Sequence, residues 1–207
     1  MTAMLEVRNL EKVYTRSRFD RTPSFRLTAD FTVEKPEIVG MMGPNGSGKT
    51  TLFELITGSN AVTSGEVRVS GRNIHKVRTD QRDRLAIHYH QSYQVRHFRS
   101  WKPNMLMEPA GSDYPMLHLF DEPQFNTQDG YIGFMLDFFR RLRNEGRLVF
   151  LCVHPNERFH LEIVEEICES FVFVNKGTVT PLPDYTSLLA HEPARAYLGD
   201  LLEECVA

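Results

Sequence analysis

A glycine-rich loop at residues 43–50 constrains the fold of this chain more than any other feature. Its sequence, Gly43-Pro-Asn-Gly-Ser-Gly-Lys-Thr50, matches the pattern G-x-x-x-x-G-K-[ST] at every fixed position. The loop follows the apolar run Ile38–Met42 and precedes a helical pattern over Lys49–Thr57, which is the context that a phosphate-binding loop requires. Its glycines let backbone N–H groups and the helix N-terminus surround a phosphate. Lys49 is expected to reach the β- and γ-phosphates of a nucleotide, and Thr50 to offer a hydroxyl to Mg²⁺. A glycine turn that merely ends a strand is the alternative, and it does not explain the matching flanks.

A second feature brings two carboxylates to the end of a mostly apolar strand. Asp121 and Glu122 follow the run Met116–Phe120 directly. Open α/β sheets bind ligands at the carboxyl ends of their strands. We therefore expect Asp121 to hold Mg²⁺ through water, and Glu122 to orient and deprotonate an attacking water molecule. A surface turn around Pro123 is the weaker alternative, because a phosphate loop lies upstream.

The order of the segments predicts an α/β protein of the P-loop NTPase class, with a mostly parallel sheet flanked by helices and a small antiparallel β element. Phe31–Val33 is expected to form a hairpin with the strand Glu37–Met42, and the polar segment Arg16–Ser24 an exposed loop. The tail is expected to be helical with a break near Pro193. The other expected elements are strands at Leu5–Val13, Gly65–Gly71, Met116–Phe120 and Leu148–Val153, a closing hairpin at Phe171–Thr180, and helices at Lys49–Thr57, ended by Gly58, and Tyr131–Asn144.

Length and composition indicate one sizeable core. With 207 residues, 41% of them hydrophobic, a single domain over residues 1–207 is expected, in which residues 184–207 form the helical tail. The net charge of −3 provides no overall field for nucleic acid, so no nucleic-acid partner is expected. The longest apolar run, Leu148–Val153, is far shorter than the ~20 residues that cross a bilayer, and the N-terminus lacks a secretory pattern. We expect a cytoplasmic protein without direct membrane insertion.

The glycine loop together with Asp121-Glu122-Pro123 resembles the ABC ATPase family, and smaller matches follow in that family's order over residues 5–180. The resemblance implies ATP and Mg²⁺ as cofactors. It implies that Tyr14 stacks on adenine, that Gln91 contacts Mg²⁺ and the attacking water, and that His154 touches the γ-phosphate. Nucleotide contacts are implied for Tyr14, Gly43, Pro44, Asn45, Gly46, Ser47, Gly48, Lys49, Thr50 and Thr51, metal contacts for Thr50, Gln91 and Asp121, and catalytic roles for Glu122, His154 and Gln91. Alternatives stay open: Tyr14 as a core aromatic residue, Gln91 as a solvated residue with Gln94 as competitor, and His154 as a helix cap.

The resemblance fails between Gln91 and Asp121. Only 30 positions separate these residues, the stretch holds the single glycine Gly111, and the family's signature Leu-Ser-Gly-Gly-Gln is absent. In the family this segment forms a helical subdomain whose signature binds the γ-phosphate held by the opposite subunit, so a reduced helical subdomain is expected here. Hydrolysis is expected to be slow or to depend on a partner, because donors to the transferring phosphoryl group supply most of the catalysis. The segment Gln124–Gln128 also differs from the family's Thr-x-x-Leu-Asp.

Two functions are consistent with these features. The first is an ABC-family ATPase subunit that couples ATP binding and slow hydrolysis to a protein partner, a membrane permease or a fuller ABC subunit, at the inner face of a membrane. The second is a binding switch or assembly protein with little turnover. A small P-loop kinase is disfavoured, because it does not explain the paired acids or His154. His88, His90 and His97, with Arg96 and Arg99, are expected to form a solvated basic patch or a docking face beside Trp101 rather than a metal site.

Overall fold

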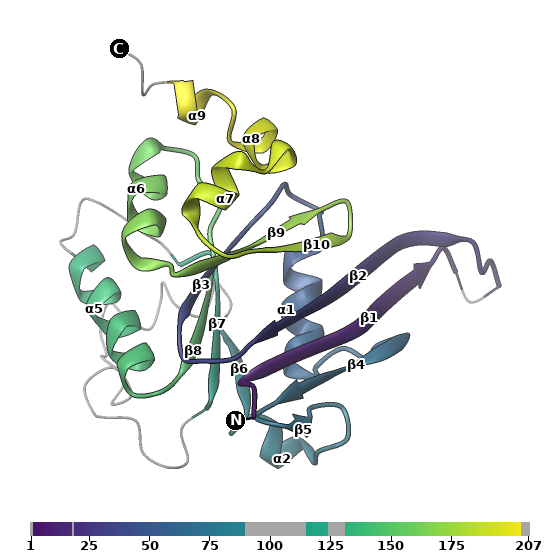
Figure 1. Cartoon of the computed structure of the whole chain (residues 1–207). Helices are drawn as coiled ribbons and strands as arrows, with labels where there is room; N and C mark the ends of the chain where they lie inside the picture. Colours follow the sequence, from purple (N-terminus) through teal and green to yellow (C-terminus); the bar gives the residue numbers. More distant parts are fainter. Residues whose placement is uncertain (1, 18, 90–114, 124–130, 204–207) are drawn as a thin grey trace.

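The computed structural model describes residues 2–17, 19–89, 115–123 and 131–203. Within these ranges the chain forms a ten-stranded sheet in the order β5-β4-β1-β2-β10-β9-β3-β8-β7-β6 (Figure 1). The strands are β1 Leu5–Thr15, β2 Pro23–Val33, β3 Ile38–Met42, β4 Ser64–Val69, β5 Arg72–Asn73, β6 Ala86–Tyr89, β7 Leu117–Asp121, β8 Leu148–Cys152, β9 Ser170–Asn175 and β10 Thr178–Leu182. The helices are α1 Lys49–Thr57, α2 Thr79–Arg82, α5 Tyr131–Asn144, α6 Arg158–Ile167, α7 Tyr185–Ala190, α8 Glu192–Leu198 and α9 Asp200–Glu203. The expected fold class is confirmed.

Five neighbouring strands, β9, β3, β8, β7 and β6, run parallel to one another. Every residue of β3, β7 and β8 is buried, as expected for parallel strands covered on both faces. Met41 and Phe150 pack in the core cluster that contains α1, whereas Met42 and Leu151 pack in the cluster that contains α5 and α6. Figure 1 shows α1 on one side of these strands and α5 and α6 on the other. The carboxyl ends of β3, β7 and β8 therefore meet at the same end of the sheet.

The antiparallel element is a long hairpin of β1 and β2, with β4 beside β1 and β5 beside β4. The predicted hairpin of Phe31–Val33 with Glu37–Met42 is wrong, because β2 pairs with β1 and β10 whereas β3 lies between β8 and β9. Burial gives the physical reason. Alternate residues from Leu27 to Val33 are buried, which suits a half-exposed antiparallel strand, but β3 is buried throughout and needs buried strands on both sides. Because β2 begins at Pro23, the exposed loop is also shorter than predicted.

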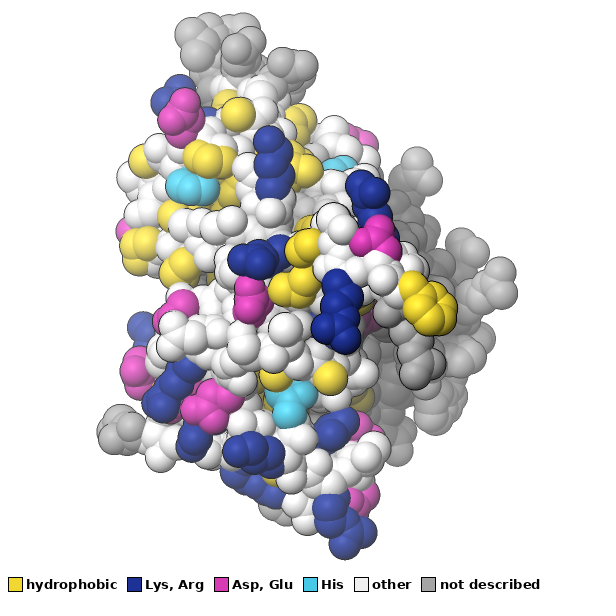
Figure 2. All heavy atoms as spheres, turned by 90° about the vertical axis from the view of Figure 1, so that its right-hand side faces the viewer, with side chains coloured by type: hydrophobic (Ala, Val, Ile, Leu, Met, Phe, Trp, Pro, Cys, Tyr) yellow, Lys and Arg dark blue, Asp and Glu magenta, His cyan; other side chains and the backbone are white. Residues whose placement is uncertain are grey.

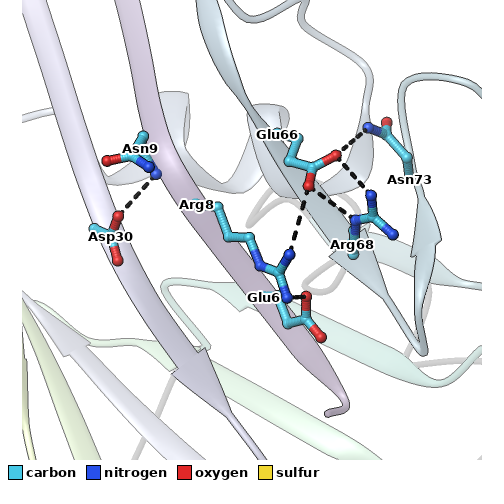
Figure 3. Close-up of polar contacts among 7 residues, drawn as sticks. All are labelled: Glu6, Arg8, Asn9, Asp30, Glu66, Arg68 and Asn73. Atoms are coloured by element: carbon cyan, nitrogen blue, oxygen red, sulfur yellow. Dashed lines mark hydrogen bonds and ion pairs between the residues drawn. The ribbon is translucent and has the colours of Figure 1, made fainter. Parts of the chain in front are cut away.

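The outward face of the antiparallel element is held together by charged side chains. Figure 2, which views the molecule from the side of the β1–β2 hairpin, shows basic and acidic side chains interspersed over this face. In Figure 3, Arg8 of β1 lies between Glu6, at 2.6 Å, and Glu66 of β4, at 3.8 Å. Arg68 and Asn73 contact the same Glu66 carboxylate at 2.9 Å and 3.1 Å. Solvent screens such surface pairs, so they support the register of β1 and β4 rather than dominate its stability.

The described part of the tail is helical and has a break near Pro193, as predicted: α7 ends at Ala190 and α8 begins at Glu192. Pro193 lies in the first turn of α8, where the backbone N–H groups have no helical partner in any case. The separations fall at His191 and Gly199. Ala194 and Leu198 of α8 are buried in the core cluster on the α5 and α6 side, which fixes the tail to the sheet. Within the described ranges, no helix is long and apolar enough to cross a membrane.

Candidate nucleotide-binding site

The glycine loop joins the carboxyl end of β3 to the first turn of α1. Gly43 has a φ of 148°, and a Cβ at this position would lie 2.0 Å from the carbonyl oxygen of Val174 on β9. Gly48 has a φ of 113°, and its Cβ would lie 2.8 Å from Cδ1 of Leu27 on β2. Both positions require glycine, because of the conformation and the close approach of the neighbouring strands. At Gly46, by contrast, no described atom lies within 4 Å of such a Cβ, so this part of the loop is open to a ligand.

The turn that joins β9 to β10 holds the loop from behind. The Gly177 N–H donates to the carbonyl of Ser47 at 2.9 Å. The carbonyl of Gly177 in turn accepts a hydrogen bond from the Thr28 N–H of β2 at 2.7 Å. The sequence predicted a closing hairpin at Phe171–Thr180, and the structure shows that the turn of this hairpin supports the glycine loop.

Lys49 and Thr50, in the first turn of α1, lie where the sequence predicts polar groups for a nucleotide. The Lys49 ammonium donates to the carbonyls of Gly43, at 2.6 Å, and Pro44, at 2.9 Å, and its side chain is buried. The Thr50 hydroxyl donates to Oδ2 of Asp121 at 3.2 Å. The ammonium, the hydroxyl and the carboxylate are therefore concentrated around one loop.

These groups line a pocket of about 270 Å³. Two strands contribute to its wall in addition to the loop and α1: β2 through Phe25, and β7 through Asp121, which Glu122 follows. The lining residues are Phe25, Asn45, Gly46, Gly48, Lys49, Thr50, Thr51, Asp121 and Glu122. The pocket thus brings together eight of the predicted site residues. The described predicted residues outside its lining are Tyr14, Gly43, Pro44, Ser47 and His154.

The two acidic residues differ in their environment. Asp121 is buried at the end of β7, opposite Cys152 of β8. Burial alone would raise the pKa of Asp121, but hydrogen bonds from His88 and other neighbouring side chains together lower it, so the carboxyl group is an anion at neutral pH. Glu122 has a φ of 50°, and its N–H donates to the carbonyl of Cys152 at 2.9 Å. A left-handed conformation at a non-glycine residue is uncommon and concentrates at functional positions.

His88 was wrongly predicted to belong to a solvated basic patch. Its side chain is 8% exposed, and its Nε2 lies 3.4 Å from Oδ2 of Asp121. Its ring packs edge-on against Phe53 of α1, with 5.2 Å between the centroids. The β6–β7 pairing explains this position, since His88 lies on β6, the strand next to the one that carries Asp121. His90, His97, Arg96, Arg99 and Trp101 of that predicted patch lie outside the described residues.

The aromatic residue that lines the pocket is Phe25 rather than Tyr14. The two residues face each other across the β1–β2 pair, with 6.3 Å between their ring centroids. The Tyr14 hydroxyl accepts a hydrogen bond from Nδ2 of Asn60 at 2.7 Å, and the Lys12 ammonium lies 4.9 Å from the Tyr14 ring centroid. Sequence reasoning missed Phe25 because the predicted loop ended at Ser24 and the predicted strand began at Phe31, so Phe25 was assigned to no element, whereas β2 begins at Pro23. The alternation of Phe25 with Leu27 was the available signal.

A Tyr14→Ala substitution is expected to weaken ATP binding by about 1 kcal/mol, roughly fivefold, if the ring stacks on adenine. Tyr14→Phe keeps the ring and loses only the hydrogen bond from Asn60, so it is the matched control and should change the affinity little. Titration of both variants with ATP measures the difference. Equal affinities of the Ala and Phe variants would assign Tyr14 to the support of the hairpin instead.

His154 follows β8 at the same end of the sheet and is exposed. Its Nδ1 lies 2.7 Å from the hydroxyl of Tyr197 on α8. No local pattern predicted the contact with Tyr197, because it joins residues 43 positions apart through the packing of the tail. Gln91, the remaining predicted site residue, lies outside the described residues, and its role stays a prediction.

The residues of the pocket fit a Mg²⁺ ion bound together with a nucleotide. Mg²⁺ takes oxygen ligands and commonly uses one or two protein groups together with phosphate oxygens. The facing Thr50 hydroxyl and Asp121 carboxylate supply such oxygens beside the loop. Among the residues that the structure describes, no group of three or more His, Cys, Asp or Glu side chains could hold a metal ion.

Comparison with known proteins decides the family. The family model described as "ABC transporter" matches residues 28–132, which include the glycine loop and both acids. The chain belongs to the ABC transporter family. The ABC relatives include the lipoprotein-releasing system ATP-binding protein LolD of Xanthomonas euvesicatoria, 37% identical over 84 residues, which are 41% of this chain and 34% of LolD. The ABC transporter ATP-binding protein YxdL of Bacillus subtilis is 33% identical over 78 residues, which are 38% of this chain and 29% of YxdL. The matched region thus spans about a third of the length of these relatives.

Solved structures agree on the ABC fold. An ATP-binding subunit of an ABC transporter superposes with a TM-score of 0.67 at 19% identity, over 99% of this chain and 100% of the other. A nucleotide-free ATP-binding cassette from an ABC transporter superposes with a TM-score of 0.70 at 15% identity, over 94% and 98% of the two chains. At these identities the likeness concerns the fold alone.

Proposed function

We propose that this chain binds ATP with Mg²⁺ in the described pocket and couples binding and slow hydrolysis to a protein partner, a membrane permease or a fuller ABC subunit. One observation carries the proposal: Lys49 and Thr50 of α1 and the acids at the end of β7 line the same pocket, although about 70 residues separate them in the sequence. The family and the fold support the same ligand. A position at the inner face of a membrane, reached through the partner, is part of this proposal.

Each residue has a role that follows from its chemistry. The Lys49 ammonium would leave the loop carbonyls for the β- and γ-phosphates, which are stronger acceptors because they are charged. Thr50 and Asp121 would hold Mg²⁺, which neutralises phosphate charge when bound. Glu122 would orient a water molecule and accept its proton. His154 would donate to the γ-phosphate, and Gln91 would complete the metal and water contacts.

A binding switch with little turnover is the second candidate function, and the missing signature favours it. The sequence contains no Leu-Ser-Gly-Gly-Gln that could act on ATP held by a second copy. Because stabilisation of the transferring phosphoryl group supplies much of the catalysis, loss of these donors slows turnover more than it weakens binding. A partner that supplies donors would restore turnover.

Affinity purification of the tagged full chain from cells that naturally express it separates the two functions. The purification is run with ATP and Mg²⁺, and with the Lys49→Ala variant as the control for nucleotide dependence. A membrane permease that is enriched by the unaltered chain but not by Lys49→Ala would support the transporter subunit. Enrichment of a non-membrane partner alone would support the binding switch, and the same set of proteins on both chains would contradict both functions.

A further inference from the structure

We propose that Tyr197 is a positioning residue for the γ-phosphate: its hydroxyl donates to Nδ1 of His154 and thereby presents the Nε2–H of His154 to the nucleotide. This inference rests on the proposed function, because it deepens the role of the histidine at the same site. It assigns a function to the C-terminal tail, whose helix α8 carries Tyr197. The observation that carries it is the 2.7 Å contact between the Tyr197 hydroxyl and Nδ1 of His154.

The location of this pair puts it within reach of the pocket. His154 follows β8, whose last residue Cys152 pairs with Asp121 on one side and with Met41 on the other. The chain thus leaves β8 between the start of the phosphate loop and the acidic end of β7. Burial, together with the neighbouring Cys152 and Glu122, raises the pKa of Tyr197 to about 12. The hydroxyl therefore keeps its proton at neutral pH and lies near the acidic end of the pocket.

The chemistry of the two groups favours the Tyr197 hydroxyl as the donor. A neutral imidazole carries one proton, and its other nitrogen is a good acceptor, whereas a tyrosine hydroxyl is an effective donor. A hydrogen bond from the hydroxyl to Nδ1 selects the tautomer with the proton on Nε2. His154 is exposed, so a ligand can reach its ring. In this tautomer the ring offers an N–H to a phosphate oxygen, and in the other tautomer Nε2 would offer a lone pair, which phosphate repels.

The tail holds Tyr197 firmly enough for such a role. Ala194 and Leu198, three residues before and one residue after Tyr197, are 0% and 2% exposed. Residues at this spacing share one face of a helix, so Tyr197 lies on the face that α8 packs against the sheet. Its ring centroid lies 5.9 Å from that of Phe173 on β9. The phenol ring is therefore anchored by packing. It also lies 5.9 Å from the His154 ring, centroid to centroid, a contact that Tyr197→Phe keeps while it removes the hydroxyl.

The experiment removes that hydroxyl and compares ATP with ADP. In the full chain with Mg²⁺, Tyr197→Phe is expected to weaken ATP about three- to tenfold, the usual range for one hydrogen bond, and to leave ADP unchanged because ADP has no γ-phosphate. In a His154→Ala background the same substitution should change neither affinity. Tyr185→Phe, which deletes the same atom from α7 of the same tail, is the matched control and should bind both nucleotides normally.

Nitrogen NMR of the unaltered chain reports which ring nitrogen of His154 carries the proton. A purely structural role of Tyr197 would not affect this proton. The NMR spectrum should show His154 protonated on Nε2 with Nδ1 as acceptor, and a mixture of tautomers in Tyr197→Phe. Three results would each overturn the proposal: equal effects of Tyr197→Phe on ATP and ADP affinity, an effect that persists in the His154→Ala background, or a proton on Nδ1 in the unaltered chain. None of them would contradict ATP binding or the proposed function. If the unaltered chain bound no nucleotide, that result would instead contradict the proposed function.

Discussion

Replacing Lys49 by alanine is expected to lower the affinity for ATP by about 100-fold or more, roughly 3 kcal/mol. Lys49 is the only Lys or Arg among the residues that line the described pocket. Its ammonium already lies on the loop, on the carbonyls of Gly43 and Pro44. Without it, the phosphates keep only backbone N–H donors and the helix N-terminus. Displacement of a fluorescent ATP analogue measures the loss.

Lys35→Ala is the matched control for this substitution. Lys35 is exposed and lies between β2 and β3. It is therefore at the opposite end of β3 from the phosphate loop, which follows that strand. The control makes the same change in net charge and should bind ATP as the unaltered chain does. Thermal unfolding of both variants shows that they are folded. An unchanged affinity in folded Lys49→Ala would remove the assignment of the loop as the phosphate site.

Glu122→Gln is expected to lower the rate of ATP hydrolysis by about 100-fold or more and to leave ATP binding nearly unchanged, since a positioned general base contributes about 10² to 10⁴ in rate. The amide has almost the same shape but cannot accept the proton of the attacking water. Glu165→Gln on the exposed side of α6 is the control with the same chemical change. Steady-state phosphate release measures all three proteins. A Glu122→Gln variant with normal turnover would mean that another group activates the water.

The same assay, with light scattering, tests the expected dependence on a partner. The isolated chain should hydrolyse ATP slowly and stay largely monomeric with ATP, because the signature that would bind ATP across a dimer is absent. A partner that supplies phosphate donors should raise the rate by about 10³ to 10⁵, by analogy with arginine fingers. Fast hydrolysis by a chain that dimerises alone with ATP would show that an unrecognised substitute for the signature exists.

Local sequence patterns correctly predicted the elements whose turn, cap and hydrophobic patterns suit their place in the fold. The loop from Gly43, the helix Lys49–Thr57 and the acidic end of β7 lie as predicted, because each combines a turn or cap signal with an apolar run. Helix α5 was predicted with its observed bounds, Tyr131–Asn144, because its apolar residues recur at helical spacing. The phosphate loop could thus be recognised before any pairing of strands was known.

The contacts that sequence reasoning missed depend on strand order and tertiary packing. Phe25 reaches the pocket only because β2 pairs with β1 and passes over Gly48. His88 meets Asp121 only because β6 lies next to β7. Tyr197 meets His154 only because the tail folds back over β9. No local pattern encodes such neighbours, and the predicted hairpin with β3 failed for the same reason.

Isothermal titration calorimetry of the full chain with ATP tests whether the described pocket binds ATP with Mg²⁺. With Mg²⁺ present, we expect saturable binding of one ATP per chain, weaker binding when the metal is chelated, and no detectable binding by Lys49→Ala under the same conditions. The metal dependence follows because Thr50 and Asp121 would hold Mg²⁺ against the phosphates. Absence of saturable binding by the folded, unaltered chain, or equal binding by Lys49→Ala, would contradict the account.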